Sequence, residues 1–316
     1  MREYGSESAA ARAMDYSFLL GNEAHAWQVY AEASTHPDWS LPRWAAVFGT
    51  WLKGGSERDM FEKALQQTAA GAAREHLVFM MLFLDKLPSD EAMEMLRQVS
   101  VRRDSFSFLH VASGIQAFRR RDFPALLKSW SALNERLTSA SLRQDRSLNY
   151  TLPYLALAHW AAGTLDSFKV SVKTYAIRFV RDFDTLLARA VVAAAEAHPD
   201  LSTDLFWQAF IENSSAAQRP IPTELMLLDV LEGVYEQTRN ARYRTALIDI
   251  SRRMQRSWPT AYYYAVESNY AASEPERLRA LGIALHLDRN SAHLAQFSEE
   301  EKERARQWFA HNRPFP

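Results

Sequence analysis

The sequence has no cysteine and only 10 glycines among its 316 residues. Without cysteine the chain can form no disulfide, no thiolate nucleophile and no cysteine-ligated metal site.

Long apolar runs are also missing. The longest uncharged one, residues 77–84, is far shorter than the roughly 20 residues that span a bilayer, so we expect a buried helix there. Glu3, Glu7 and Asp15 interrupt the region where a secretory signal needs a continuous apolar core. We therefore expect a cytoplasmic protein, although a chain whose leader had been removed would look the same.

Catalytic motifs are missing too. The sequence has no phosphate-cradling glycine-rich loop, no GxSxG elbow and no HExxH metal helix. His76 and His159 could each act as an acid or a base, but a lone histidine on a helix more often has a structural role. Asp182 and Asp184 are two residues apart, so on a helix they point in different directions and act as helix-start charges rather than as a carboxylate dyad. We predict no catalytic residue, no cofactor and no metal site.

Overall composition and charge describe an ordinary globular chain. Apolar residues make up 47% and charged residues 24% of the sequence, which is enough apolar material for a large core. The formal net charge of −1 gives no overall attraction to nucleic acid or to anionic lipid, so no nucleic-acid partner is expected.

The most informative pattern is a recurring break between two helical stretches, every 31 to 42 residues along the sequence. Such a period is typical of helix-pair repeats, because one pair cannot bury its own apolar face and must stack on its neighbours. The breaks are Gly21-Asn22, Gly54-Gly55, Leu87-Pro88, Arg121-Asp122, Gly163-Thr164, Pro199-Asp200, Asn240-Ala241 and Ala272-Ser273.

The first pair shows the pattern most clearly. Residues 9–20 and 23–34 flank the Gly21 turn, and Pro37 follows the second stretch, where it cannot continue a helix. Ala26, Tyr30 and Ala33 fall on one face of the second helix. Small residues there allow close helix approach, and the aromatic ring fills the gap between layers.

This arrangement resembles the tetratricopeptide repeat, a family of helix-turn-helix units of about 34 residues. The likeness recurs in three further segments. In one, Gly114 stands inside a first helix. The packing positions that follow the turns are Leu126, Trp130 and Leu133 in one unit, and Tyr243, Ala246 and Ile250 in another. Residues 284–290 are similar to the family's end-of-repeat signature, with Arg289 where proline is usual. Weaker copies include Phe168 and Val172 after Gly163.

The resemblance implies an all-α fold, a right-handed α-α superhelix (solenoid) of about eight helix hairpins, in one domain over residues 1–316. Two polar segments, 138–149 and 213–222, are expected to be loops and are candidates for a joint within that domain. Ser298 followed by Glu299, Glu300 and Glu301 predicts the capped start of a charged final helix, which would shield the last apolar layer.

Charge patterning gives the one lead toward a partner. Arginine outnumbers lysine 30 to 7, and its planar guanidinium binds carboxylates through two parallel hydrogen bonds. Two stretches, 97–121 and 239–256, each contain six arginines against one aspartate, whereas 182–212 contains six acids and one arginine. The alternative is that these arginines pair with acids on the next helical layer. The candidate partner-binding residues are Arg102, Arg103, Arg119, Arg120, Arg121, Arg252, Arg253 and Arg256.

Aromatic residues allow two interpretations. Tyr262, Tyr263 and Tyr264 are consecutive and so surround most of a helix, which predicts that at least one faces outward or toward a groove. For most other rings, Trp207 included, packing between layers is expected.

Three functions follow from these observations. We expect a non-enzymatic scaffold or adaptor that binds a protein or peptide segment, possibly an acidic one, on the concave face formed by the first helices of successive pairs. A sensor that closes around a peptide or small ligand, as some bacterial repeat proteins do, is the second possibility. An enzyme on an all-helical scaffold is the third and least favoured. The excess of arginine over lysine hints at a bacterial source.

Overall fold

The structure is a computed structural model. It describes residues 89–99, 108–138, 146–212, 223–257, 260–289 and 291–312, together with a few isolated positions before residue 89. The predicted turns at Gly21 and Gly54, the break at Leu87-Pro88 and the 213–222 loop lie outside the described residues.

Every regular element in the described part of the chain is a helix, as the sequence predicts, and no β-strand occurs there. The elements of the first half are α6 (Ser89–Val99), α7 (Phe108–Arg119), α8 (Phe123–Ser129), α9 (Ser131–Thr138), the 3-10 helix η1 (Arg146–Thr151), α10 (Leu152–Ala161), α11 (Leu165–Arg178) and α12 (Phe183–Ala195). Those of the second half are α13 (Pro199–Glu212), α14 (Thr223–Thr238), α15 (Ala241–Ser257), α16 (Ala261–Tyr270), α17 (Glu274–Leu287), the 3-10 helix η3 (Ala292–Leu294) and α18 (Glu299–Asn312).

The predicted breaks at Arg121-Asp122, Gly163-Thr164, Asn240-Ala241 and Ala272-Ser273 coincide with turns between these helices, whereas Pro199 and Asp200 begin α13 and the turn lies just before them, at residues 196–198. Arg121, Gly163, Ala197 and Arg239 each follow a helix with a positive φ, between 53° and 72°. After each of the first three, the backbone amide of the following residue (122, 164 or 198) donates to the carbonyl oxygen five positions before it. This hydrogen bond satisfies a carbonyl at the helix end that has no partner within the helix. The same turn therefore recurs after α7, α10 and α12, although only one copy uses glycine, the residue that adopts this conformation without strain.

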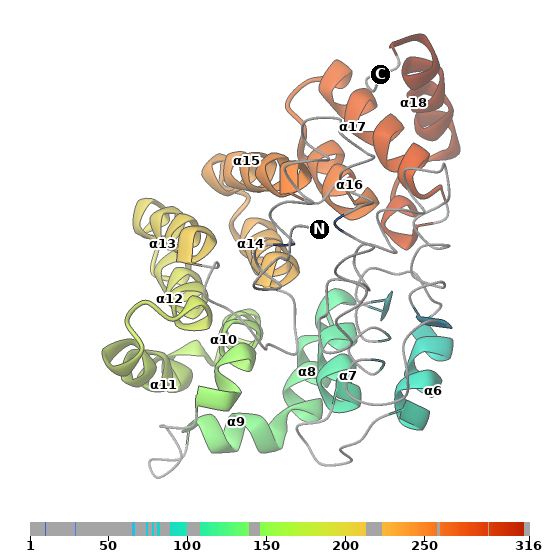
Figure 1. The fold of residues 1–316 in the computed structure, drawn as a ribbon. Helices are drawn as coiled ribbons and strands as arrows, with labels where there is room; N and C mark the ends of the chain where they lie inside the picture. The colour runs from blue at the N-terminus through green and yellow to red at the C-terminus, as the bar shows by residue number, and fades with distance from the viewer. Residues whose placement is uncertain are drawn as a thin grey trace.

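Helices pack mainly on their neighbours in the sequence. Each first helix of a pair contacts the second, and the first helices also contact one another, α10 against α12 and α12 against α14. On the other side α9 contacts α11, and α13 contacts α15. In Figure 1 the helices follow one another in chain order around an arc, from α6 through α11 and α15 to α18.

Close approach of α7 to the next helices depends on Gly114. A Cβ atom built on this residue would overlap the indole of Trp130, which is completely buried. The predicted packing residues Leu126 and Leu133, on either side of that tryptophan, are buried as well. This confirms the predicted combination of a small residue on the first helix and a large ring on the partner.

Other predicted packing positions are also confirmed. Phe168 and Val172 on α11 are buried, as are Tyr243, Ala246 and Ile250 on α15. These residues recur at helical spacing on the side of each second helix that faces the core.

Two local details differ from the sequence expectations. The helix predicted after Asp122 is interrupted at Trp130, so that α8 and α9 are separate elements. The ends of the segment 138–149, expected to be a loop, are helical, because Thr138 is the last residue of α9 and residues 146–149 belong to η1; residues 139–145 lie outside the described residues. Within η1, Asn149 is buried and donates to Asp182, which ties this segment to the start of α12.

The final helix begins as predicted. The amide of Glu301 donates to the Ser298 hydroxyl at 3.2 Å, and the Glu301 carboxylate accepts from the Ser298 amide at 2.8 Å. This reciprocal pair is a capping box.

α18 packs against α17, where Gly282 allows the approach, since a Cβ there would lie 2.7 Å from the Ala305 carbonyl oxygen.

Candidate interaction surface

Arg119, the first of the described candidate arginines, forms an ion pair inside the protein. Its Nε lies 3.4 Å from a carboxylate oxygen of Asp229, a buried residue on α14 that is 110 positions away. Tyr154 on α10 and Tyr262 on α16 donate hydroxyl protons to the same carboxylate, at 3.5 and 3.2 Å. Burial and the Asp229 charge raise the pKa of both hydroxyls well above the usual tyrosine value, so they remain donors.

Arg121 is also engaged within the chain. From the turn after α7, its Nε lies 2.5 Å from Glu236, and its guanidinium lies 3.7 Å from Glu232, both on α14. Tyr270 donates its hydroxyl proton to Glu232 at 2.6 Å. Burial raises the pKa of Glu232, and the Tyr270 hydrogen bond and the Arg121 charge act in the opposite direction.

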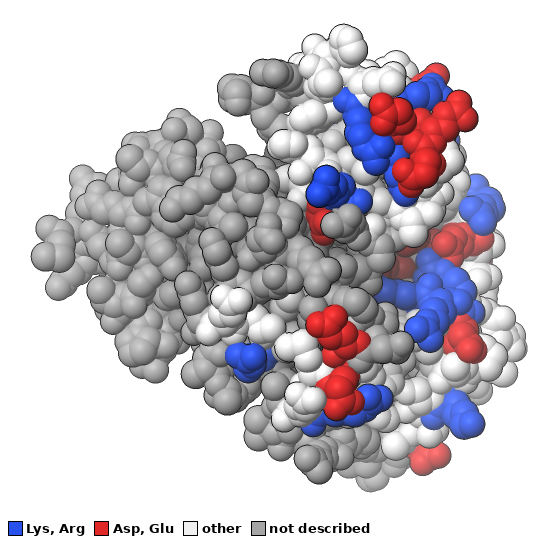
Figure 2. Space-filling model, turned by 90° about the vertical axis from the view of Figure 1, so that its right-hand side faces the viewer, with Lys and Arg blue, Asp and Glu red and all other residues white. Residues whose placement is uncertain are grey.

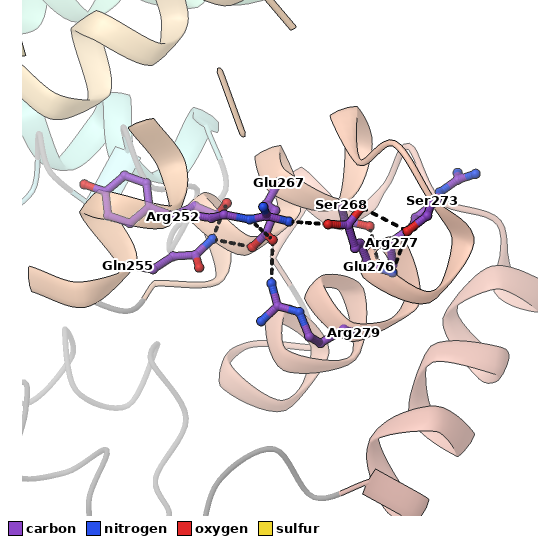
Figure 3. Close-up of polar contacts among 9 residues, drawn as sticks. Arg252, Gln255, Glu267, Ser268, Ser273, Glu276, Arg277 and Arg279 are labelled. Carbon is purple, nitrogen blue, oxygen red and sulfur yellow. Dashed lines mark hydrogen bonds and ion pairs between the residues drawn. The ribbon is translucent and has the colours of Figure 1, made fainter. Parts of the chain in front are cut away.

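Arg252 belongs to a second network, centred on the fully buried Glu267 of α16 (Figure 3). Arg252 of α15 and Arg279 of α17 lie 2.7 and 2.5 Å from one Glu267 oxygen, and Gln255 donates to the other at 2.8 Å. Arg252 also reaches Glu276 at 2.8 Å. The Glu267 carboxylate therefore links three consecutive helices, α15, α16 and α17, and the two guanidinium groups compensate its charge.

Arg120 and Arg253 are different. Both are exposed, and neither forms an ion pair among the described residues. The Arg253 guanidinium lies 4.9 Å from the ring centre of Trp207 on α13, a cation-π contact. Trp207 is in turn in edge contact with Phe210, at 5.9 Å between ring centres. Both rings are partly exposed, which differs from the core position expected for Trp207.

Three candidate arginines remain. Arg102 and Arg103 lie outside the described residues, and the side chain of Arg256 does too. The arginines at 119, 121 and 252 thus follow the alternative weighed for the basic stretches, pairing with acids on adjacent layers. Figure 2 shows basic and acidic side chains next to one another on the face it presents, rather than in separate patches.

The first helices of the pairs, expected to line a concave binding face, are buried over long runs. These runs cover residues 152–158 of α10, 183–188 and 190–194 of α12, 225–231 of α14 and 261–268 of α16. Because each run exceeds one turn, no face of the helix is exposed along it. The sequence predicts that at least one of Tyr262, Tyr263 and Tyr264 faces outward or toward a groove. All three lie within the last run, at 4 to 7% exposed, so none of them faces outward. α15 and α17 pack on α16 and help to cover them.

His159, Asp182 and Asp184, considered above as possible acid-base residues, have structural roles in the fold. His159 bonds Thr164 and Asn134 through its two ring nitrogens, at 2.9 and 3.2 Å, and stacks on Phe168 at 4.7 Å. Burial lowers its pKa. Asp182 is the N-cap residue of α12 and Asp184 lies in its first turn, which confirms their position at a helix start. His76 lies outside the described residues.

Within the described residues no group of three or more histidine, aspartate or glutamate side chains is placed to hold a metal ion. None of the described helices is both long enough and apolar enough to cross a membrane.

Sequence reasoning missed one surface feature. Large aliphatic side chains are exposed on two second helices and the turn after one of them: Val170, Ile177, Val180, Leu201 and Ile211, at 51 to 80%. A signal was present, because Val170 and Ile177 lie on the face of α11 opposite the packing residues.

Comparison with models of known protein families, with curated protein sequences and with solved structures finds no match for this chain. The class that the fold defines is an all-helical protein whose helices pack on their neighbours in the chain.

Proposed function

We propose that this chain is a non-enzymatic interaction scaffold, built as a solenoid of tetratricopeptide-like helix pairs. The support is the packing order. The first helix α12 contacts the first helices α10 and α14, and among the second helices α9 contacts α11 and α13 contacts α15, as expected where hairpins stack in sequence. The turn that recurs after α7, α10 and α12 lies at the matching place in these three pairs.

The partner segment, in this proposal, binds on the second-helix side rather than in the concave face. The first helices are buried over the runs given above, which leaves them little free surface. On the second-helix side, Arg253 of α15 lies over Trp207 of α13, next to Phe210. Arginine and tryptophan are the residue types that most often dominate binding energy at protein interfaces.

The single observation that carries this proposal is the exposed Arg253 guanidinium, which lies 4.9 Å from the Trp207 ring centre and forms no ion pair among the described residues. A guanidinium held over an aromatic ring can still donate hydrogen bonds through its N–H groups. A carboxylate of the partner could accept two of these hydrogen bonds, while an apolar side chain packs on Trp207 and Phe210. We therefore expect an acidic segment that also carries an apolar or aromatic anchor.

The test compares binding by the full chain and two variants. The immobilised chain is used to capture proteins from its native source, and each captured segment is remade as a labelled synthetic peptide. Its affinity is measured by fluorescence anisotropy against the wild type, Arg253→Glu and Trp207→Ala. We expect each substitution to weaken binding at least tenfold, about 1.4 kcal/mol.

The matched control is Arg289→Glu, a charge reversal at another exposed arginine. It should bind within about twofold of the wild type, since surface charges away from the contact contribute little. Equal affinity of the wild type and Arg253→Glu, or the absence of any captured acidic segment, would contradict the proposal.

A further inference from the structure

The exposed aliphatic side chains form two stripes with the same spacing. On α11 and the turn after it, the stripe consists of Val170, Lys173, Ile177 and Val180, and on α13 it consists of Leu201, Asp204, Gln208 and Ile211. In both, the steps along the chain are three, four and three residues, and all eight positions are exposed. On α13, and on α11 as far as Ile177, this is the spacing of a coiled-coil seam, in which a second helix lies along the stripe; Val180 lies in the turn after α11.

The two stripes differ in charge. Lys173 lies inside the first stripe and Asp204 at the equivalent position of the second, and neither forms an ion pair among the described residues. Arg178 and Arg181, also exposed and unpaired there, add positive charge beside the first stripe. One stripe is thus basic and apolar, and the other is acidic and apolar.

The stripes also have a common direction. α11 and α13 both pack against α12, and short turns join them to it. Consecutive helices joined by such turns run antiparallel, so α11 and α13 run the same way (Figure 1). A two-fold axis parallel to these helices would place α11 of one copy on α13 of another, and α13 on α11, in parallel orientation.

We infer that this face binds a second copy of the chain in a two-fold dimer. In register, Val170 faces Leu201 of the other copy, Lys173 faces Asp204, and Ile177 faces Gln208. Each contact occurs twice, as a two-fold interface requires. Aliphatic side chains that are exposed in the single chain become buried, and the two unpaired charges find partners. This dimer uses other residues than the scaffold function, although Trp207 lies beside the α13 stripe, three residues after Asp204 and four before Ile211.

The first experiment measures mass in solution for the full chain by light scattering and sedimentation velocity. We expect twice the monomer mass at high protein concentration. Ile177→Asp, at a position 80% exposed, should leave the fold intact by circular dichroism and give a monomer. A wild-type monomer at every concentration would overturn the inference, and so would a dimer that persists in Ile177→Asp.

The second experiment tests the register by charge exchange. Lys173→Asp and Asp204→Lys each bring like charges together at both contacts, so each variant alone should weaken the dimer at least tenfold. Their equimolar mixture brings opposite charges together at both contacts and should dimerise, as should the Lys173→Asp/Asp204→Lys double variant. The matched controls are Lys128→Asp and Asp249→Lys, at exposed positions outside the stripes, which should dimerise as the wild type does.

Two results would count against this geometry. A mixture that stays monomeric excludes the Lys173 to Asp204 contact. Mass that keeps rising with concentration indicates a head-to-tail chain of copies instead of a closed pair. Since Arg253→Glu leaves both stripes intact, it should dimerise normally, so failure of the dimer and failure of the proposed scaffold function are distinguishable.

Discussion

Gly114 on α7 lies directly against the indole ring of Trp130, so that the place where a Cβ atom would be is already filled. Trp130 is fully buried and donates its ring N–H to the carbonyl oxygen of His110 at 3.2 Å. The ring therefore has little freedom to move aside.

Replacement of Gly114 by alanine should destabilise the protein by about 1 to 3 kcal/mol, the usual cost of overpacking a core. This outweighs the gain of about 1 kcal/mol that alanine brings to a helix interior. Chemical denaturation measures the change, with Ser113→Ala on the same helix as a control expected to change stability by less than about 0.5 kcal/mol. A Gly114→Ala protein more stable than the wild type would show that the ring can shift.

In the recurring turn, we expect substitutions at two equivalent positions to change stability in opposite directions. Gly163 and Ala197 have φ values of 72° and 60°, and no atom lies within 4 Å of a Cβ built on Gly163. Gly163→Ala should therefore lower stability by about 1 kcal/mol through backbone strain alone. Ala197→Gly relieves the same strain and should raise stability by up to about 1 kcal/mol. Thermal unfolding of both variants measures this, and shifts of the same sign would show that the turn geometry does not decide the outcome.

Among the polar residues of helices α13 to α18, Glu267 should be one of those whose substitution lowers stability most. In Glu267→Gln, the guanidinium groups of Arg252 and Arg279 lose their common counter-charge. Breaking a fully buried ion pair costs about 3 to 5 kcal/mol. Here the two arginine side chains are 36% and 35% exposed and can be partly rehydrated, so we expect about 2 kcal/mol.

Denaturant unfolding measures this loss, and Glu299→Gln is the control. Glu299 pairs with Lys302 at the surface, where solvent screens the charges, so its substitution should change stability much less than that of Glu267. Equal effects of the two substitutions would mean that burial of Glu267 is unimportant.

His159 should make stability depend on pH. Burial lowers its pKa in the folded state, so the unfolded state binds a proton more readily below the unfolded value of about 6.5. Stability from this residue is complete above that value and decreases as the pH falls through it. In His159→Gln, the loss of stability between about pH 7.5 and 5.5 should be smaller than in the wild type. Denaturation curves at both pH values measure this, and identical pH dependence would exclude a contribution from His159.

Much of the fold was predictable because it depends on local pattern. Helix breaks at Arg121, Gly163 and Asn240 coincide with observed turns, since turn residues and helical spacing act over a few positions. The Ser298 cap was predictable for the same reason. The interruption at Trp130 was not, because the tryptophan fits the helical pattern of buried residues on both sides of it.

The candidate site was harder to predict. The sequence contained the arginine-rich stretches but not their partners, and Arg119 pairs with a residue 110 positions away. Exposure of Trp207 likewise depends on how α13 lies beside α15. A partly exposed tryptophan and a buried one can have the same local sequence pattern.

By itself, then, the sequence determined the helical class, most of the places where hairpins turn and the inward side of α11 and α15, because these follow from spacing and turn chemistry within one or two pairs. Only the tertiary structure decided which arginines are neutralised, that the first helices are buried along much of their length, and that aliphatic side chains of α11 and α13 remain exposed. The physical reason is that burial and charge pairing depend on which distant helices come together, and no local pattern specifies that.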